Sequence, residues 1–223
     1  MANAVLQSID LGFRNYAAPD YARFAALAFG PPALVLAFVF LQPWSEPAVF
    51  LLDPLAIAQD PARCCAFYSG AVSNLGIVLW ASASAVAFFA AFSGASSVNA
   101  RFLVATASFS AILMIDDLFM LHEDALPSIG VPELVVMGAY LAIAAAYGLT
   151  FFTKIIAGRA ALAVLAAGLM AASVIEDQTK ILWPIHDLVE DGAKFTGIYC
   201  WFLFVVLRSR DAIFASKAAG CTR

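Results

Sequence analysis

Charged residues are scarce in this sequence, and their scarcity excludes the usual soluble folds. Asp, Glu, Lys and Arg make up 13% of the 223 residues, whereas soluble domains carry about 25%. Hydrophobic residues account for 63%, which is more apolar surface than a water-soluble fold of this length can bury. The composition therefore predicts an integral membrane protein.

Several functional motifs are also missing. The sequence has no Gly-rich phosphate loop and no haem-attachment motif, and its net charge of −4 argues against binding nucleic acid. The four cysteines do not form the pattern of a structural zinc site. No Glu lies three residues before either histidine, which excludes the Glu-x-x-His pattern of di-iron helical bundles.

Apolar runs long enough to cross ~30 Å of hydrocarbon recur along the chain. We expect an all-α integral membrane protein with about six transmembrane helices in a single bundle over residues 23–210. The expected spans are 24–41, 71–92, 102–121, 134–152, 160–175 and 195–207. Pro31 and Pro32 should bend the first span because proline removes a helix hydrogen bond.

The two ends of the chain are expected to lie outside the bundle. Residues 1–22 have no apolar core behind a basic start, so we interpret them as an interfacial arm and not as a signal peptide. Residues 211–223 are expected to form a cytoplasmic tail.

The charges are distributed unequally between the two ends of the expected spans. Nine of the twelve Lys and Arg residues fall in the termini and in the loops after the second and fourth spans. The positive-inside rule therefore predicts cytoplasmic termini, in what we interpret as a bacterial inner membrane. Thirteen of the sixteen acids lie toward the opposite face, which indicates either an ordinary acidic exterior or a cation site.

An internal near-repeat supports the cation site. The third span ends in Asp116-Asp117 and is followed by His122, while the fifth ends in Glu176-Asp177 and is followed by His186. We therefore expect two related helical hairpins, made of spans three and four and of spans five and six. Packed together, they would place both histidines and up to ten carboxylates in one cluster.

The spacing of residues adds detail to each hairpin. His186, Glu190 and Lys194 recur every four residues and would form one stripe if the sixth helix extends back to His186. Glu176 and Lys180 have the same spacing, and Asp116 and Glu123 would lie two turns apart on one helical face. Ionisable groups at such depth in a membrane are costly and usually functional.

These residues predict a polar site with divided roles. Imidazole together with carboxylate suits a divalent metal, most of all zinc or iron. The expected metal ligands are His122, Glu123, Glu176, Asp177, His186 and Glu190. The expected catalytic groups are Asp116, Asp117, Lys180 and Lys194.

Three classes of function fit this pattern. The first is a membrane-embedded metal-dependent enzyme, a hydrolase or an oxidoreductase, that acts on a lipid-soluble substrate near the outer face. The second is an ion- or proton-coupled membrane transporter. The third is an accessory structural subunit of a membrane complex. The expected partners are the lipid bilayer and, through faces rich in small residues, further copies of the chain or a larger complex.

Overall fold

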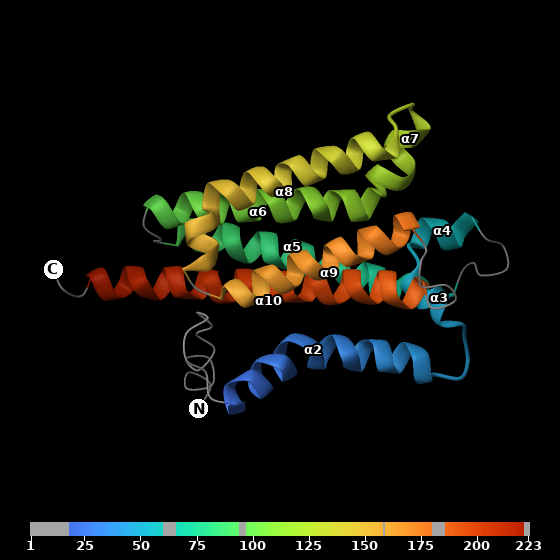
Figure 1. Ribbon diagram of the computed structural model, residues 1–223, viewed down its shortest axis with the longest axis horizontal. Coiled ribbons are helices and arrows are strands. Elements are labelled where there is room, and N and C mark those ends of the chain that lie inside the picture. The colour runs from blue at the N-terminus through green and yellow to red at the C-terminus, as the bar shows by residue number, and fades with distance from the viewer. Residues whose placement is uncertain (1–17, 60–65, 94–96, 158, 180–185, 221–223) are drawn as a thin grey trace. The chain divides into compact units, whose positions relative to one another are not determined.

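The computed structural model describes residues 18–59, 66–93, 97–157, 159–179 and 186–220 (Figure 1). All regular elements among these residues are helical. They are α2 (Ala18–Leu41), α3 (Pro47–Leu51), α4 (Pro54–Gln59), α5 (Ala71–Phe92), α6 (Ser97–Phe119), a π-helical turn (Leu121–Ala125), α7 (Leu126–Ser128), α8 (Glu133–Ile156), α9 (Ala160–Thr179) and α10 (His186–Gly220). Most of the expected interfacial arm, residues 1–17, lies outside the described residues.

Among the described residues, five helices are long and apolar enough to cross a membrane. The segments concerned are Ala22–Leu41, Ala71–Phe92, Asn99–Phe119, Glu133–Ile156 and Ala160–Thr179. The sixth expected span, 195–207, lies within α10, where Lys194 and Arg208 flank the apolar stretch. An all-helical chain with several helices of membrane-spanning length is therefore confirmed, and the sixth span stays a prediction.

The chain forms two compact units. The first contains residues 1–76 and 161–203, and the second contains residues 77–160 and 204–223. In the first unit α2 continues through Pro31 and Pro32 and changes direction along its length (Figure 1). Gln42 closes this helix, because its side-chain nitrogen donates to the carbonyl of Ser45 at 2.6 Å while its oxygen accepts from the backbone amides of Trp44 and Ser45 at 3.0 Å each.

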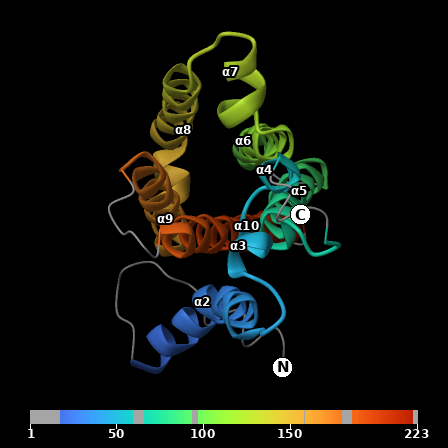
Figure 2. The same ribbon diagram turned by 90° about the vertical axis from the view of Figure 1, so that its right-hand side faces the viewer.

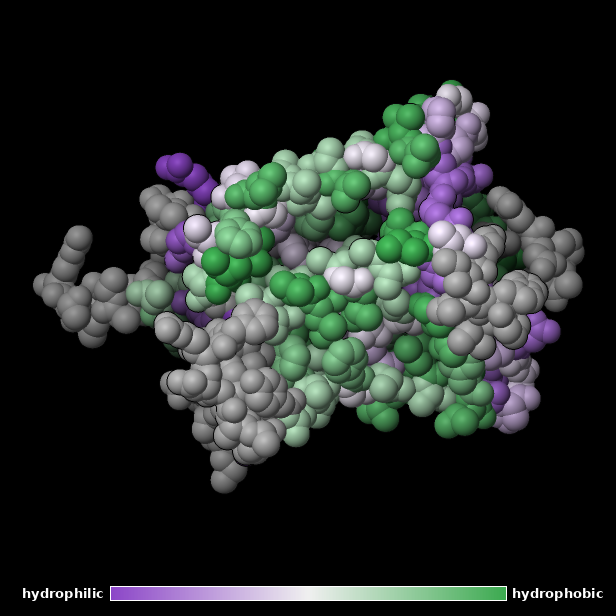
Figure 3. Space-filling model, viewed as in Figure 1, coloured by the Kyte–Doolittle hydropathy of each residue, from purple (hydrophilic) through white to green (hydrophobic). Residues whose placement is uncertain are grey.

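The second unit contains a helical hairpin. Helices α6 and α8 lie side by side, and the π-helical turn and α7 connect them at one end (Figures 1 and 2). Ser84 of α5 donates a hydrogen bond to the carbonyl of Ala107 of α6 at 3.0 Å, which fixes α5 against this hairpin. The surface of α8 is largely apolar, and hydrophilic residues gather where α7 joins the hairpin (Figure 3).

Close helix contact in the first unit depends on Gly197. A Cβ atom at this position would lie 2.9 Å from Cγ of Met170 and 3.2 Å from the carbonyl oxygen of Ala166, both on α9. Gly138, which occupies the matching place in the near-repeat, has no atom within 4 Å of such a Cβ. The two hairpins of the repeat therefore differ in how closely a neighbouring helix approaches the returning helix.

We expect Gly197→Ala to destabilise the protein and Gly138→Ala to leave its stability unchanged or higher. Overpacking costs about 1–3 kcal/mol, whereas alanine in an open helical position gains about 1 kcal/mol over glycine. Apparent unfolding temperatures of both variants in detergent, at one scan rate, measure the difference. Equal shifts in the two variants would contradict the close contact at Gly197.

Candidate functional site

The candidate site of the second unit begins where α6 ends. Asp116 and Asp117 lie in the last part of α6, which stops at Phe119. Met120 then takes a left-handed backbone conformation, with φ 48° and ψ 48°, before the π-helical turn Leu121–Ala125. Left-handed residues other than glycine and π-helical turns are both typical of functional sites, because they are unfavourable without a compensating contact.

This turn corrects one prediction from the sequence. Asp116 and Glu123 do not lie two turns apart on one continuous helix, because α6 ends before Glu123. The turn instead brings His122 back toward α6, so that Asp116 and Glu123 reach the same imidazole from two sides.

Asp116 is the most enclosed acid of this site, with 4% of its surface exposed. Its carboxylate accepts three hydrogen bonds: from the backbone amide of His122 at 3.1 Å, from the Nδ1 side of the His122 ring at 2.6 Å, and from the hydroxyl of Tyr140 at 2.8 Å. These three donors replace the water that burial removes from the carboxylate.

His122 is held between two carboxylates. Its Nδ1 lies 2.6 Å from Oδ2 of Asp116, and its Nε2 lies 3.1 Å from Oε1 of Glu123. Burial by itself lowers the pKa of His122, but the hydrogen bonds and negative charges of Asp116 and Glu123 outweigh burial and raise this pKa to about 10. The ring is therefore an imidazolium cation at neutral pH, with both nitrogens donating.

Asp117 has a separate partner. The indole Nε1 of Trp80 on α5, a residue that is 1% exposed, donates to Oδ2 of Asp117 at 3.0 Å. The adjacent acids of the pair therefore face different helices. Asp116 binds the turn and α8, and Asp117 binds α5.

A polar seam runs along the contact between α6 and α8. Glu133, Tyr140, Tyr147 and Lys154 recur every seven residues on α8, and all four are partly buried while most of the surrounding helix is exposed. Lys154 donates to the side-chain oxygen of Asn99 on α6 at 3.2 Å. The seven-residue spacing on a helix keeps side chains on one face.

The middle of this seam combines hydroxyl groups with aromatic rings. The hydroxyl of Tyr147 lies 2.8 Å from that of Thr106, which is 1% exposed. The Tyr147 ring stacks on Phe109 at 5.2 Å between ring centres and on Phe102 at 6.3 Å. Sequence reasoning missed Trp80, Tyr140, Tyr147 and Thr106 as site residues, although the seven-residue spacing of the tyrosines was a usable signal.

The first unit contains a similar group of three residues. His186 begins α10, its Nε2 lies 3.0 Å from Oε2 of Glu190, and its Nδ1 lies 3.5 Å from Oε1 of Glu176 on α9. Glu176 is 5% exposed and His186 is 8% exposed. Helix α10 begins at His186, so the condition under which the sequence aligned His186 with Glu190 is met.

The remaining predicted site residues have other positions. Asp177 accepts a hydrogen bond from Gln178 at 3.0 Å on the exposed side of α9. Lys194 lies one turn beyond Glu190 on α10 and is partly buried. Lys180 lies outside the described residues.

The arrangement around His122 suits a proton better than a single metal ion. The two ring nitrogens point in different directions, so Asp116 and Glu123 cannot join one ion together with the same nitrogen. A metal bound at Nε2 would have Glu123 as its neighbouring ligand, while Asp116 would orient the ring from Nδ1. Within the described residues, no group of three or more His, Cys, Asp or Glu side chains is placed to hold a metal.

We expect the stability that His122 contributes to depend on pH. The pKa of His122 is about 10 in the folded protein and 6.5 for an ordinary histidine, so its contribution to stability is complete below pH 6.5 and is lost as the pH rises toward 10. The unfolding temperature of His122→Gln should therefore lie below that of the wild type at pH 6 and approach it by about pH 10. Asp124→Asn, a change at a nearby exposed acid, serves as control, and a pH-independent effect of His122→Gln would contradict the ion pair.

Comparison with known proteins places the chain in a family without assigning an activity. No curated protein and no solved structure matches it. One family model matches residues 26–207, a range that includes both His122 and His186 with their neighbouring carboxylates. Because this match covers most of the sequence, the chain belongs to the family described as Domain of unknown function (DUF8692).

Proposed function

We propose that this protein is an ion- or proton-coupled membrane transporter in which His122 and its two carboxylates bind the coupling proton. The observation that carries the proposal is an imidazole held between the buried Asp116 and the more exposed Glu123, at one end of a polar seam through apolar helices. Ionisable groups within membrane segments commonly form proton relays.

The local chemistry favours the protonated ring of His122, so release of the proton requires a change in the contacts around it. With its proton, the imidazolium balances one of the two neighbouring carboxylate charges and donates from both nitrogens. Loss of the proton removes one donor and leaves two carboxylates close to a neutral ring, which is unfavourable in an apolar environment. The turn Leu121–Ala125 carries both His122 and Glu123. Loss of the proton from His122 would therefore shift the turn toward a different conformation.

The α6–α8 seam supplies polar groups beyond the proton site. Tyr140 donates a hydrogen bond to Asp116. The next tyrosine on the same face of α8 is Tyr147, which lies about 10 Å further along the helix. Tyr147 pairs with Thr106, and Lys154 with Asn99 marks the far end of the seam. Hydroxyl groups at this spacing need bridging water to pass a proton, since a direct hydrogen bond spans about 3 Å.

The proposal includes the finer topology expected from the sequence. In it, α10 contributes a sixth span, both termini are cytoplasmic, and the membrane is a bacterial inner membrane. His186 with Glu176 and Glu190 forms the second protonatable group, which belongs to the second of two related hairpins.

A second candidate is the metal-dependent membrane enzyme, a hydrolase or an oxidoreductase. The contact of Asp116 with Nδ1 of His122 favours it, because a carboxylate on one ring nitrogen is the usual support for a histidine that binds metal through the other. In that case zinc or iron would bind at Nε2 beside Glu123 and polarise a water molecule or a lipid-soluble substrate. The described residues supply two of the ligands that such an ion needs.

Proton flux into liposomes tests the transporter directly. We expect purified wild-type protein, reconstituted with a pH-sensitive dye inside the vesicles, to carry protons when a potassium diffusion potential is applied. His122→Asn and Asp116→Asn should lower this flux by at least about tenfold, since general acid–base groups contribute ~10²–10⁴-fold to the steps they serve. Tyr147→Phe should slow it while keeping the fold, and the exposed control Asp124→Asn should leave it unchanged.

The same preparations separate the alternatives. Absence of flux in wild-type vesicles, or equal flux in His122→Asn, would contradict proton transport by this site. Elemental mass spectrometry of the same samples then decides between the others. About one equivalent of zinc or iron, lost in His122→Ala, would support the enzyme, and protein without metal or flux would indicate an accessory structural subunit.

A further inference from the structure

Basic residues gather at the opposite end of the second unit from His122. Arg159 follows α8, while Arg208 and Arg210 lie on the part of α10 that belongs to this unit. Asp211 binds two of them, with Nε of Arg159 at 3.1 Å from Oδ2 and an Nη atom of Arg210 at 3.1 Å from Oδ1. Arg208 lies within electrostatic range of both Asp211 and Arg159.

The arginine cluster, made of Arg159, Arg208, Arg210 and Asp211, contains more basic than acidic side chains. It contains three guanidinium groups and one carboxylate, whose two oxygens accept from Arg159 and Arg210. The side chain of Arg159 is 4% exposed, and its backbone takes the left-handed conformation with φ 61°. These four side chains have a formal charge of +2 beside apolar helix ends, a setting that favours a bound anion.

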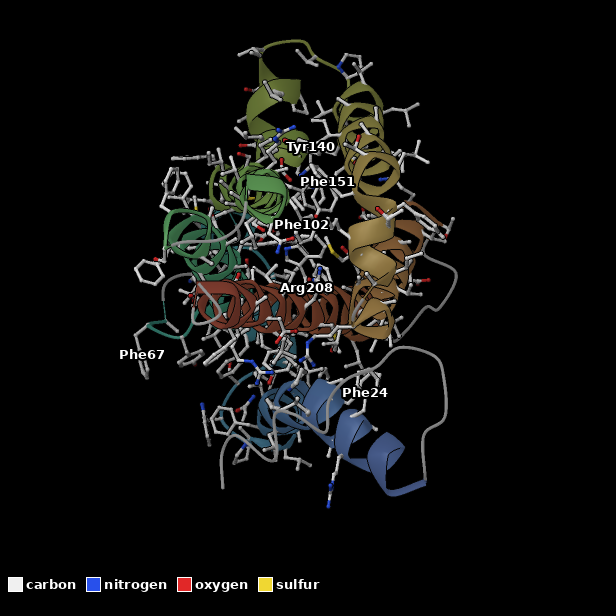
Figure 4. All side chains as sticks on the ribbon, turned by 90° about the vertical axis from the view of Figure 1, so that its left-hand side faces the viewer. Phe24, Phe67, Phe102, Tyr140, Phe151 and Arg208 are labelled. Atoms are coloured by element: carbon white, nitrogen blue, oxygen red, sulfur yellow. The ribbon has the colours of Figure 1, made fainter. Side chains whose placement is uncertain are left out.

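Arg208 is the member best placed to bind that anion. Its guanidinium carbon lies 5.7 Å from the centre of the Phe102 ring, and Figure 4 shows Arg208 directed from α10 toward Phe102 and Phe151. Its Nε is buried and has no hydrogen-bond partner among the residues that the structure describes. Guanidinium groups present parallel N–H donors that match phosphate oxygens, and a ring on one face leaves these in-plane donors available.

The depth of the cluster defines where the anion would lie. The apolar segment Asn99–Phe119 begins at this end of the unit, and the apolar segment Glu133–Ile156 ends there. The hydrogen bond from Lys154 to Asn99 lies at the same end. Residues at the ends of membrane-spanning helices lie at the level of phospholipid headgroups, where basic pockets bind anionic lipids.

We propose that Arg208, supported by Arg159 and Arg210, forms a binding site for a phosphate-bearing anion, supplied either by an anionic phospholipid headgroup or by a soluble phosphate compound. The phosphate would accept hydrogen bonds from Arg208 and bring negative charge to the arginine cluster. This site is separate from the proton site at His122 and does not depend on transport.

Calorimetric titration of the detergent-purified full chain tests the site. The probes are dioctanoyl-phosphatidylglycerol, dioctanoyl-phosphatidylcholine and inorganic phosphate. We expect saturable binding of phosphatidylglycerol, weakened about tenfold or more in Arg208→Gln because a hydrogen bond to a charged group is lost. The control Arg101→Gln removes the same charge from an exposed position of α6 and should change the affinity by less than about twofold.

Titration with inorganic phosphate shows whether the bound phosphate comes from a lipid headgroup or from a soluble compound. Weakened binding of both phosphatidylglycerol and inorganic phosphate in Arg208→Gln would show that the phosphate group alone is recognised, whereas loss restricted to phosphatidylglycerol would identify a lipid site. Arg208→Lys keeps the charge without the guanidinium and should also weaken binding, so it serves if Arg208→Gln does not fold. Equal losses in Arg208→Gln and Arg101→Gln, equal binding of phosphatidylcholine, or no binding to wild type would overturn the proposal.

Discussion

A carboxylate buried in an apolar helix needs partners that replace water, and Asp116 finds three of them at the end of α6. Two come from the π-helical turn through His122, and one comes from Tyr140 on α8. The left-handed Met120 lets the chain turn back toward Asp116, and the contact with Tyr140 sets the register of α8 against α6. The local strain, the turn and the helix pairing are thus all linked to the charge of one side chain.

The first unit also contains a buried carboxylate beside a histidine, but in a different local geometry. Glu176 is buried near the end of α9 and faces His186, which begins the next helix and reaches Glu190 one turn later. In both units a histidine lies between an acid of the preceding helix and an acid that follows it in sequence. Charge pairing of this kind accounts for four of the acids at this end of the expected spans, Asp116, Glu123, Glu176 and Glu190. It supports the proposal that the protein binds protons there.

Sequence reasoning predicted the features that depend on local patterns. The apolar runs predicted helices of membrane-spanning length, and the four-residue spacing of His186 and Glu190 predicted their contact. A turn between the third and fourth spans was predicted, but its π-helical form and the return of His122 to Asp116 were not. They depend on the hydrogen bonds that the buried Asp116 accepts and not on the helix propensities of Leu121–Ala125. The polar seam was missed because tyrosine counts as apolar in a hydropathy pattern, although Tyr140 and Tyr147 place hydroxyl groups between helices.

The protonation state of His122 is the central claim, and the nitrogen-15 NMR spectrum of its ring reports it directly. The chain has two histidines, so in protein labelled at histidine the His186→Asn variant leaves His122 as the one source of ring signals. We predict that both ring nitrogens carry protons at pH 8 and that the ring titrates near pH 10. A neutral ring at pH 8, titrating near the ordinary histidine value of 6.5, would contradict the account.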